Sequence, residues 1–276
     1  MIVFPNCKIN LGLNILNKRS DGYHNLETIF YPIPLTDSLE IIENRQTVKS
    51  PTFPFTTSGI PISGKPSSNL CVKAYRLLKQ DFPDMPGVKI HLHKIIPSGA
   101  GLGGGSADAA FSLKVMNELF KLQLTNEQLI HYAAKLGSDC PFFIINKPCF
   151  ASGRGEILEE IQLDLSLFKF IIVNPRIHID TGRAFLNMTP SKPEKSVKEI
   201  IAGPLESWKD ELINDFEKII FQQHHEIMEI KDSLYRNGAI YVSMSGSGST
   251  VVGIFPKDQP LHLSFSVNYF VKELYC

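Results

Sequence analysis

The first regular feature of the chain is an alternation of apolar and polar positions over residues 7–15. The apolar members are Cys7, Ile9, Leu11, Leu13 and Ile15, and the polar members are Lys8, Asn10 and Asn14. Because successive side chains of a strand point to opposite faces, this period of two predicts a strand with one polar face. A turn signal follows at residues 19–22, Arg-Ser-Asp-Gly, and the chain resumes at Tyr23 and His24.

Similar patterns predict more strands, at residues 38–43, 88–96, 168–173, 239–244 and 250–255, with the last two paired. Helical spacing begins at Asn69, recurs beyond residue 106, and fills 197–237. Thr125 and Gln128 form a capping box for a helix that should end at Gly137.

Residues 51–68 and most of 175–196 read as loops, the second with a short helix inside. Hairpins interspersed with helices favour an α+β fold in two domains, which we place at residues 1–157 and 158–276.

Charge and cysteine content narrow the classes of partner and compartment. Lysines plus arginines equal aspartates plus glutamates at 28 each, so no basic excess favours a nucleic acid or a membrane surface as partner. The five cysteines are odd in number and form no C-x-x-C pair, which argues against a disulfide framework or a zinc site. No secretion signal or long apolar run is evident, so we expect a cytoplasmic protein, monomeric or homodimeric.

A glycine-dense segment over residues 97–108 is the first candidate for a ligand-binding site. Five of its twelve residues are glycine, and a helical face of Ala109, Leu113, Met116 and Phe120 follows. A glycine turn that opens a helix gathers unobstructed N–H groups at the positive end of the helix dipole, which suits phosphate. The structural alternative is a plain turn before a helix.

Three well-known nucleotide motifs do not fit this segment. The dinucleotide fingerprint needs an acid about 20 residues on, at the end of a strand, and residues 121–124 here, Lys-Leu-Gln-Leu, lie between two helical patterns. The Walker motif requires Gly-Lys-Ser or Gly-Lys-Thr, and protein kinases carry His-Arg-Asp and Asp-Phe-Gly, none of which occurs. A different kind of phosphate cradle is therefore the hypothesis.

Phosphoryl transfer also needs a base, a cation and a metal ion. Asp139, between a helix-ending glycine and an apolar run, is the candidate base, with a helix or turn cap as its structural alternative. Lys8 is the candidate cation, and its alternative is a solvated strand face. Ser106 could serve phosphate or Mg²⁺, or act as an N-cap. The small residues of 245–249 suit a second phosphate or substrate contact, or a plain hairpin loop.

Taken together, these motifs resemble the small-molecule kinases named for galactokinase, homoserine kinase, mevalonate kinase and phosphomevalonate kinase. The resemblance is carried by Lys8 in the first strand, by the run Pro97–Ala107, and by Ser-Gly-Ser-Gly-Ser at 245–249. Within this family the match narrows to the members that act on 4-diphosphocytidyl-2-C-methyl-D-erythritol. That narrower likeness rests on Lys-Ile-Asn-Leu at 8–11, Asp-Gly-Tyr-His at 21–24 and Gly-Ser-Asp-Cys-Pro at 137–141.

The resemblance implies a two-domain α+β kinase with its site in the cleft between the halves. It implies transfer of the γ-phosphate of ATP, with Mg²⁺ held mainly by ATP, to the 2-hydroxyl of the methylerythritol unit, a step of the non-mevalonate isoprenoid pathway. Asp139 matches the base and Lys8 the lysine that polarises the hydroxyl. Tyr23 and Phe185 match aromatics that flank cytosine, and His24 the reader of the cytosine edge.

The remaining matched positions divide between the two ligands. On the substrate side these are Asn10, Thr181, Gly246 and Gly248. On the ATP side these are Asn69, Lys94, Pro97, Gly99, Ala100, Gly101, Leu102, Gly103, Gly104, Gly105, Ser106 and Ala107. Two alternatives remain open, namely another kinase of the same family, of the homoserine or mevalonate type, and a nucleotide-binding module without catalysis.

Overall fold

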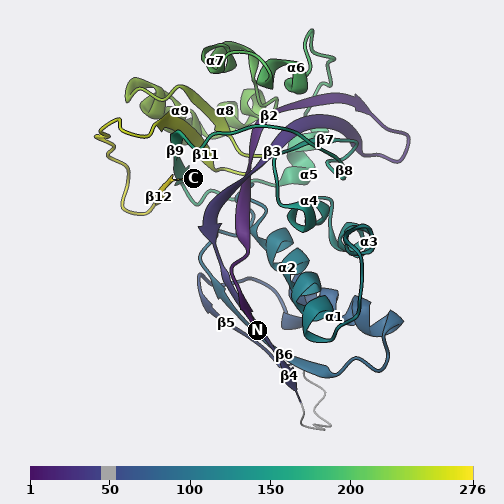
Figure 1. Ribbon diagram of the computed structural model, residues 1–276. Coiled ribbons are helices and arrows are strands. Elements are labelled where there is room, and N and C mark those ends of the chain that lie inside the picture. Colours follow the sequence, from purple (N-terminus) through teal and green to yellow (C-terminus); the bar gives the residue numbers. More distant parts are fainter. Residues whose placement is uncertain (45–53, 276) are drawn as a thin grey trace. The chain divides into compact units, whose positions relative to one another are not determined.

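The computed structural model describes residues 1–44 and 54–275 (Figure 1). Cys276 and residues 51–53 of the predicted loop lie outside the described residues. Internal contacts define two compact units, and each takes several segments of the chain. Unit 1 comprises residues 1–7, 35–98 and 103–146, and unit 2 comprises residues 8–34, 99–102 and 147–276. The domain boundary at residue 157 that the sequence favours stays a prediction.

Unit 1 contains a four-stranded sheet in the order β1 (Ile2–Val3), β4 (Ser38–Asn44), β6 (Gly87–Lys94) and β5 (Phe55–Gly59). β4 runs antiparallel to β1 and β6, whereas β5 runs parallel to β6. Val88, Ile90 and Leu92 of β6 are buried, as the alternation predicts. The prediction of a loop over 51–68 is wrong for β5, which pairs in parallel with β6. Its side chains are mostly exposed, so they show no alternation of buried and exposed positions that would mark a strand.

The helical elements of unit 1 are η1 (Pro66–Ser68), α1 (Leu70–Asp81), α2 (Gly104–Leu119), α3 (Asn126–Leu136) and α4 (Cys140–Ile145). α2 contacts α1, α3, α4 and β4, so it is the central helix of the unit (Figure 1). The capping box of Thr125 and Gln128 is confirmed, and α3 ends before Gly137. The N-cap interpretation of Ser106 is wrong, because Gly103 turns the chain at φ +69° and the helix begins at Gly104.

Unit 2 contains two four-stranded sheets. The first has the order β2 (Asn6–Lys18), β3 (His24–Thr36), β7 (Cys149–Ser152) and β8 (Ile157–Glu160). Of its first two strands, the part of β2 from residue 8 and the part of β3 up to residue 34 belong to this unit. The second has the order β10 (Tyr241–Met244), β11 (Val251–Pro256), β9 (Phe168–Asn174) and β12 (Phe270–Tyr275). The predicted antiparallel pairing of β10 with β11 is confirmed.

The helical elements of unit 2 are α5 (Thr181–Leu186), α6 (Val197–Ile201), η2 (Leu205–Ser207), α7 (Trp208–Glu211), α8 (Glu217–Gln223) and α9 (His225–Arg236). An apolar core joins β9 and β11 to α9 through Val173, Val251 and Leu234. Beyond this core, the loop of residues 245–250 closes on itself, since the N–H of Ser245 donates to the carbonyl of Thr250 at 2.9 Å. Because Met244 and Val251, which flank this loop, lie in the core, both ends of the glycine-serine loop are fixed.

Among the described residues, none of the helices combines the length and the apolar composition that a membrane span requires. The four described cysteines, Cys7, Cys71, Cys140 and Cys149, are buried, and none of them forms a disulfide bond.

Candidate functional site

In unit 2, residues 99–102 of the glycine turn pack against the loop of residues 245–248. Gly101 has a φ of +82°, and a Cβ there would overlap the carbonyl oxygen of Ser245. A Cβ on Gly248 would in turn overlap the backbone of Ala100 and Gly101. Glycine at 101 and 248 therefore allows backbone to lie directly on backbone, which no other residue would permit.

Lys8 lies beside this contact and is only 3% exposed. Its ammonium donates to Asn10 Oδ1 at 2.6 Å and to the carbonyl of Gly101 at 3.2 Å, and it lies 4.8 Å from the ring centroid of Phe30. The interpretation of Lys8 as part of a solvated strand face is therefore wrong. Burying an ammonium is costly, so the structure supplies it with polar partners at a defined place.

Asn10 and Ser245 extend the same cluster. The N–H of Asn10 donates to Ser245 Oγ at 3.2 Å, and the Ser245 hydroxyl donates to the carbonyl of Gly101 at 2.9 Å. Asn10 Nδ2 donates to Thr28 Oγ1 at 3.0 Å, and a Cβ on Gly246 would stand 3.3 Å from Asn10 Oδ1. The first strand, the turn and the glycine-serine loop, which lie far apart along the chain, thus meet around Lys8.

In unit 1, the start of α2 lies beside the start of α4. The first N–H groups of a helix have no carbonyl partner within it, and Gly105 is exposed with nothing within 4 Å of where its Cβ would stand. The Ser106 side chain hydrogen-bonds the thiol of Cys140. Burial raises the pKa of that thiol to about 12; the Ser106 hydrogen bond opposes the rise and the charge of Asp139 adds to it.

Asp139 occupies the N-cap position of α4, yet its side chain makes no capping hydrogen bond. Asp139 thus has the position of a helix cap without the hydrogen bond from its side chain, and the turn-cap alternative stays open. Because Asp139 precedes Cys140, which contacts Ser106, unit 1 brings the candidate base next to the first turn of α2.

Lys94 has a different environment from that of Lys8. It is 3% exposed and forms ion pairs with Asp37 at 2.5 Å and Asp108 at 2.7 Å. Asp37 Oδ1 also accepts the N–H groups of Ile95 and Ile96. Burial raises the pKa of Asp108 to about 7, against the opposing charge of Lys94. The ion pairs fix the segment that enters the glycine turn, and a contact of Lys94 with ATP stays a prediction.

A cavity of about 320 Å³ opens beside this cluster in unit 1, lined among others by Phe55, Ile62, Asn69, Gly105 and Asp108. Its volume lies within the range typical of small-molecule sites. Asn69 caps α1 through a 2.9 Å bond from the N–H of Cys71. One oxygen of Asp108, Oδ1, is buried without a hydrogen-bond partner, and Asp108 also lines this cavity.

The aromatic residues singled out from the sequence lie in unit 2. The rings of His24 and Phe185 stack with centroids 5.3 Å apart, and Phe216 meets Phe185 edge-on. Burial, and then the charge of Lys18, lowers the pKa of His24. Tyr23 is instead exposed, and Thr181 Oγ1 lies 2.8 Å from Ser247 Oγ.

Several residues of the glycine run can offer only backbone to a ligand. The side chains of Ala100, Leu102 and Ala107 are buried, and the carbonyl of Leu102 accepts the N–H of Lys8 at 3.0 Å. Asp37 and Asp108, the ionic partners of Lys94, were not among the site residues predicted from the sequence. Only the acidic residue within the helix that follows the glycine run could have signalled one of them.

Two family models match the chain, "GHMP kinases N terminal domain" over residues 69–147 and "GHMP kinases C terminal" over residues 196–268. A relative from Bacteroides fragilis, a 4-diphosphocytidyl-2-C-methyl-D-erythritol kinase, is 55% identical over 99% of this chain and 100% of its own length.

Solved structures of kinases are also similar to this chain. A crystal structure of a 4-(cytidine 5'-diphospho)-2C-methyl-D-erythritol kinase is 30% identical, with a TM-score of 0.78, and covers 92% of this chain and 90% of its own. A mevalonate kinase from Methanococcus jannaschii, at 14% identity and a TM-score of 0.65 over 94% and 92% of the two chains, shares the fold. The chain belongs to the GHMP kinases and, within them, to the family of 4-diphosphocytidyl-2-C-methyl-D-erythritol kinases.

Proposed function

We propose that this chain transfers the γ-phosphate of ATP to the 2-hydroxyl of 4-diphosphocytidyl-2-C-methyl-D-erythritol. The observation that carries the proposal is the placement of Asp139 beside the first turn of α2, through the contact of Cys140 with Ser106. An acidic residue close in the fold to a set of helix N-terminal amides suits a site where an alcohol must lose its proton as it attacks a bound phosphate. The 55% identical relative supports the choice of acceptor.

The nucleotide is assigned to unit 1. The 320 Å³ cavity at Asn69 and Gly105 would take the nucleoside, and the amides at the start of α2 would take the phosphates. Exposed Gly105 leaves these amides open to a phosphate, since it carries no side chain over them. The neighbouring Gly104 instead packs against Ile96 and Lys94, which fixes the helix start.

Mg²⁺ fits this arrangement as an ion carried by the nucleotide. Among the residues that the structure describes, no group of three or more His, Cys, Asp or Glu side chains could hold a metal ion. Mg²⁺ usually keeps several waters and binds through substrate phosphates with one or two protein oxygens, and Ser106 and Asp139 are the candidates here. When bound, the ion neutralises charge on the transferred phosphoryl group.

The reacting hydroxyl is assigned to two side chains. Asp139 accepts its proton, and Lys8 polarises it through a charge-assisted hydrogen bond. Lys8 suits this role because Asn10 and the Gly101 carbonyl orient its ammonium. Pre-orientation of a charged donor avoids the cost of ordering it during the reaction.

The cytosine is assigned to Tyr23, His24 and Phe185. Burial lowers the pKa of His24, which favours the neutral imidazole, in which one ring nitrogen donates and the other accepts. Two such groups can read a base edge, and aromatic rings can stack on its faces. A cytoplasmic location and the oligomeric state stay predictions.

The test is a comparison of acceptors in one assay. ADP production would be followed with the cytidylyl methylerythritol, with homoserine and with mevalonate, each at matched concentration. We expect ADP production above background with the cytidylyl alcohol alone. Turnover of homoserine or mevalonate, with the cytidylyl alcohol inert, would overturn the proposed acceptor while leaving the kinase family intact.

A further inference from the structure

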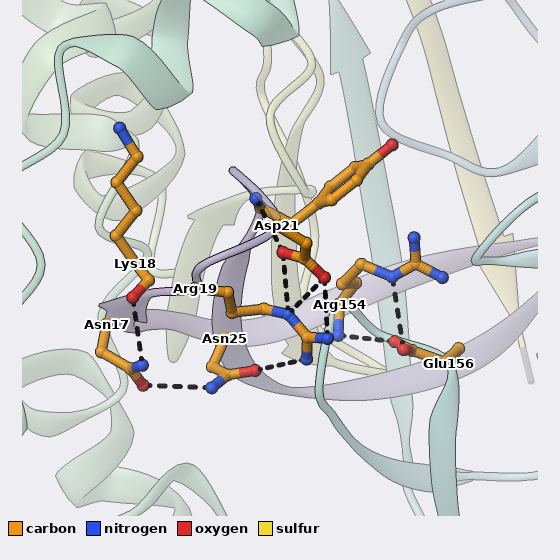
Figure 2. Close-up of polar contacts among 8 residues, drawn as sticks. Asn17, Lys18, Arg19, Asp21, Asn25, Arg154 and Glu156 are labelled. Atoms are coloured by element: carbon orange, nitrogen blue, oxygen red, sulfur yellow. Dashed lines mark hydrogen bonds and ion pairs between the residues drawn. The ribbon is translucent and has the colours of Figure 1, made fainter.

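The exposed ring of Tyr23 has a cationic neighbour from a different hairpin. Tyr23 is 55% exposed, and the guanidinium carbon of Arg154 lies 4.8 Å from its ring centroid. Arg154 stands with Glu156 in the turn between β7 and β8 (Figure 2). Tyr23 instead follows the turn between β2 and β3. A guanidinium over an aromatic face is attracted by the electron-rich face of the ring.

Arg154 is held in place from two sides. The N–H of Leu26, on β3, donates to the carbonyl of Gly153 at 2.7 Å, which ties the β7–β8 turn to β3. The carboxylate of Glu156 accepts both the backbone N–H of Arg154, at 2.5 Å, and its Nε–H, at 3.3 Å. Although partial burial works against it, hydrogen bonding to the backbone and to Arg154 lowers the pKa of Glu156, which keeps this partner charged.

The backbone of Tyr23 is fixed by the β2–β3 turn, whose Arg19, Asp21 and Asn25 are joined by side-chain hydrogen bonds (Figure 2). Asp21 Oδ1 accepts the N–H of Tyr23 at 3.1 Å, and the carbonyl of Tyr23 accepts the N–H of Arg19 at 2.8 Å. The Arg19 guanidinium holds Asp21 through Nε and Nη2 and also reaches Asn25. These bonds fix where the Tyr23 side chain starts, but an exposed ring can still turn about its side-chain bonds.

We propose that Arg154 is a positioning residue for the acceptor: its guanidinium covers one face of the Tyr23 ring and thereby presents the other face to the cytosine. This inference rests on the proposed function, in which Tyr23 stacks on the base. A ring ordered before binding spares the substrate the cost of ordering it. The effect therefore falls on binding of the cytidylyl alcohol and leaves ATP binding and the phosphoryl transfer step unchanged.

The first test is the kinetics of Arg154→Ala. Loss of an exposed cation–π contact predicts a roughly two- to fivefold rise in KM for the cytidylyl alcohol, with the KM for ATP and kcat unchanged. Arg154→Lys keeps the charge but loses the planar stack, so its KM for the cytidylyl alcohol should lie between those of the wild type and Arg154→Ala. Arg236→Ala, at an exposed arginine ending α9, is the matched control and should change neither KM. An unchanged KM for the alcohol in Arg154→Ala, or equal rises for both substrates, would overturn the inference.

A double-mutant cycle with Tyr23→Leu then separates positioning from direct contact. If Arg154 acts through the ring, Arg154→Ala adds nothing to the KM of the Tyr23→Leu variant. If the rise in KM of the double variant is instead the product of the rises in the two single variants, Arg154 contacts the substrate itself, for instance its diphosphate. That result would overturn the positioning role. Circular dichroism of each variant checks that it is folded.

The same cycle distinguishes this inference from the proposed function. If Tyr23→Leu leaves the KM for the cytidylyl alcohol unchanged, the proposed use of Tyr23 fails and the inference fails with it. If Tyr23→Leu raises that KM while Arg154→Ala leaves it unchanged, only the inference about Arg154 fails.

Discussion

Replacing Gly101 by alanine tests the close contact between the glycine turn and the glycine-serine loop. The new Cβ would overlap the Ser245 carbonyl oxygen and stand 3.2 Å from the N of Gly248. Both neighbours are backbone, so no side chain can swing aside. In addition, the φ of +82° at this position is one that alanine adopts only under strain.

The expected loss of stability has two parts. The left-handed conformation costs an L-residue about 1–2 kcal/mol, and overpacking against fixed atoms typically costs about 1–3 kcal/mol. We therefore expect the free energy of unfolding to fall by roughly 2–5 kcal/mol, a large share of the stability of an ordinary domain. The displaced Gly101 carbonyl also leaves Lys8, so kcat should fall even for the folded fraction.

Gly105→Ala is the matched control for stability. Its Cβ would meet nothing within 4 Å, and the residue lies in α2, where alanine is favoured over glycine. Urea unfolding can be followed through the fluorescence of Trp208, the single tryptophan, which is buried in unit 2. An unfolding free energy of Gly101→Ala within about 0.5 kcal/mol of Gly105→Ala would refute the reasoning, since that is the scatter of neutral surface changes.

Three further predictions concern single side chains. Asp139→Asn should bind both substrates by calorimetry but lose about 100-fold or more in kcat; near-normal turnover would remove Asp139 from the base role. His24→Ala should raise the KM of the cytidylyl alcohol roughly tenfold, because base-edge groups lose partners, without changing the KM of ATP; equal rises would contradict the assignment. Burial raises the pKa of Asp108 in the folded protein to about 7, from 3.8 for an ordinary aspartate, so folding favours the protonated carboxyl. The stability that this proton contributes is thus complete below about pH 4 and is lost as the pH rises towards 7. Between about pH 5 and about pH 8 the free energy of unfolding should therefore fall more in the wild type than in Asp108→Asn, and equal falls would contradict the raised pKa.

The elements that the sequence predicted well are those whose signals are local. The period of two over residues 88–92 marks one buried face of β6, and the capping box at Thr125 fixes the start of α3 through neighbours three residues apart. The close approach of Gly101 to Ser245 could be suspected from two glycine-rich runs, although only the fold shows that they touch.

Other features could not be predicted from the sequence, because they involve residues distant in the chain or strands without a buried face. β12, over Phe270–Tyr275, has no alternating buried face and is held by its backbone bonds to β9. Lys94 pairs with Asp37, 57 residues away, so nothing in the local pattern marks it as an ion-pair centre. Ser106 has the residue type of an N-cap, but the left-handed turn at Gly103, which no local pattern fixes, starts the helix earlier.

The most direct test of the account is phosphorus NMR of the product formed from ATP and 4-diphosphocytidyl-2-C-methyl-D-erythritol. We predict one new phosphomonoester signal, formed in equal amount with ADP, coupled to the carbon that bears the 2-hydroxyl, with the diphosphate signals retained. Release of inorganic phosphate alone, or a phosphoester on another hydroxyl, would contradict the account.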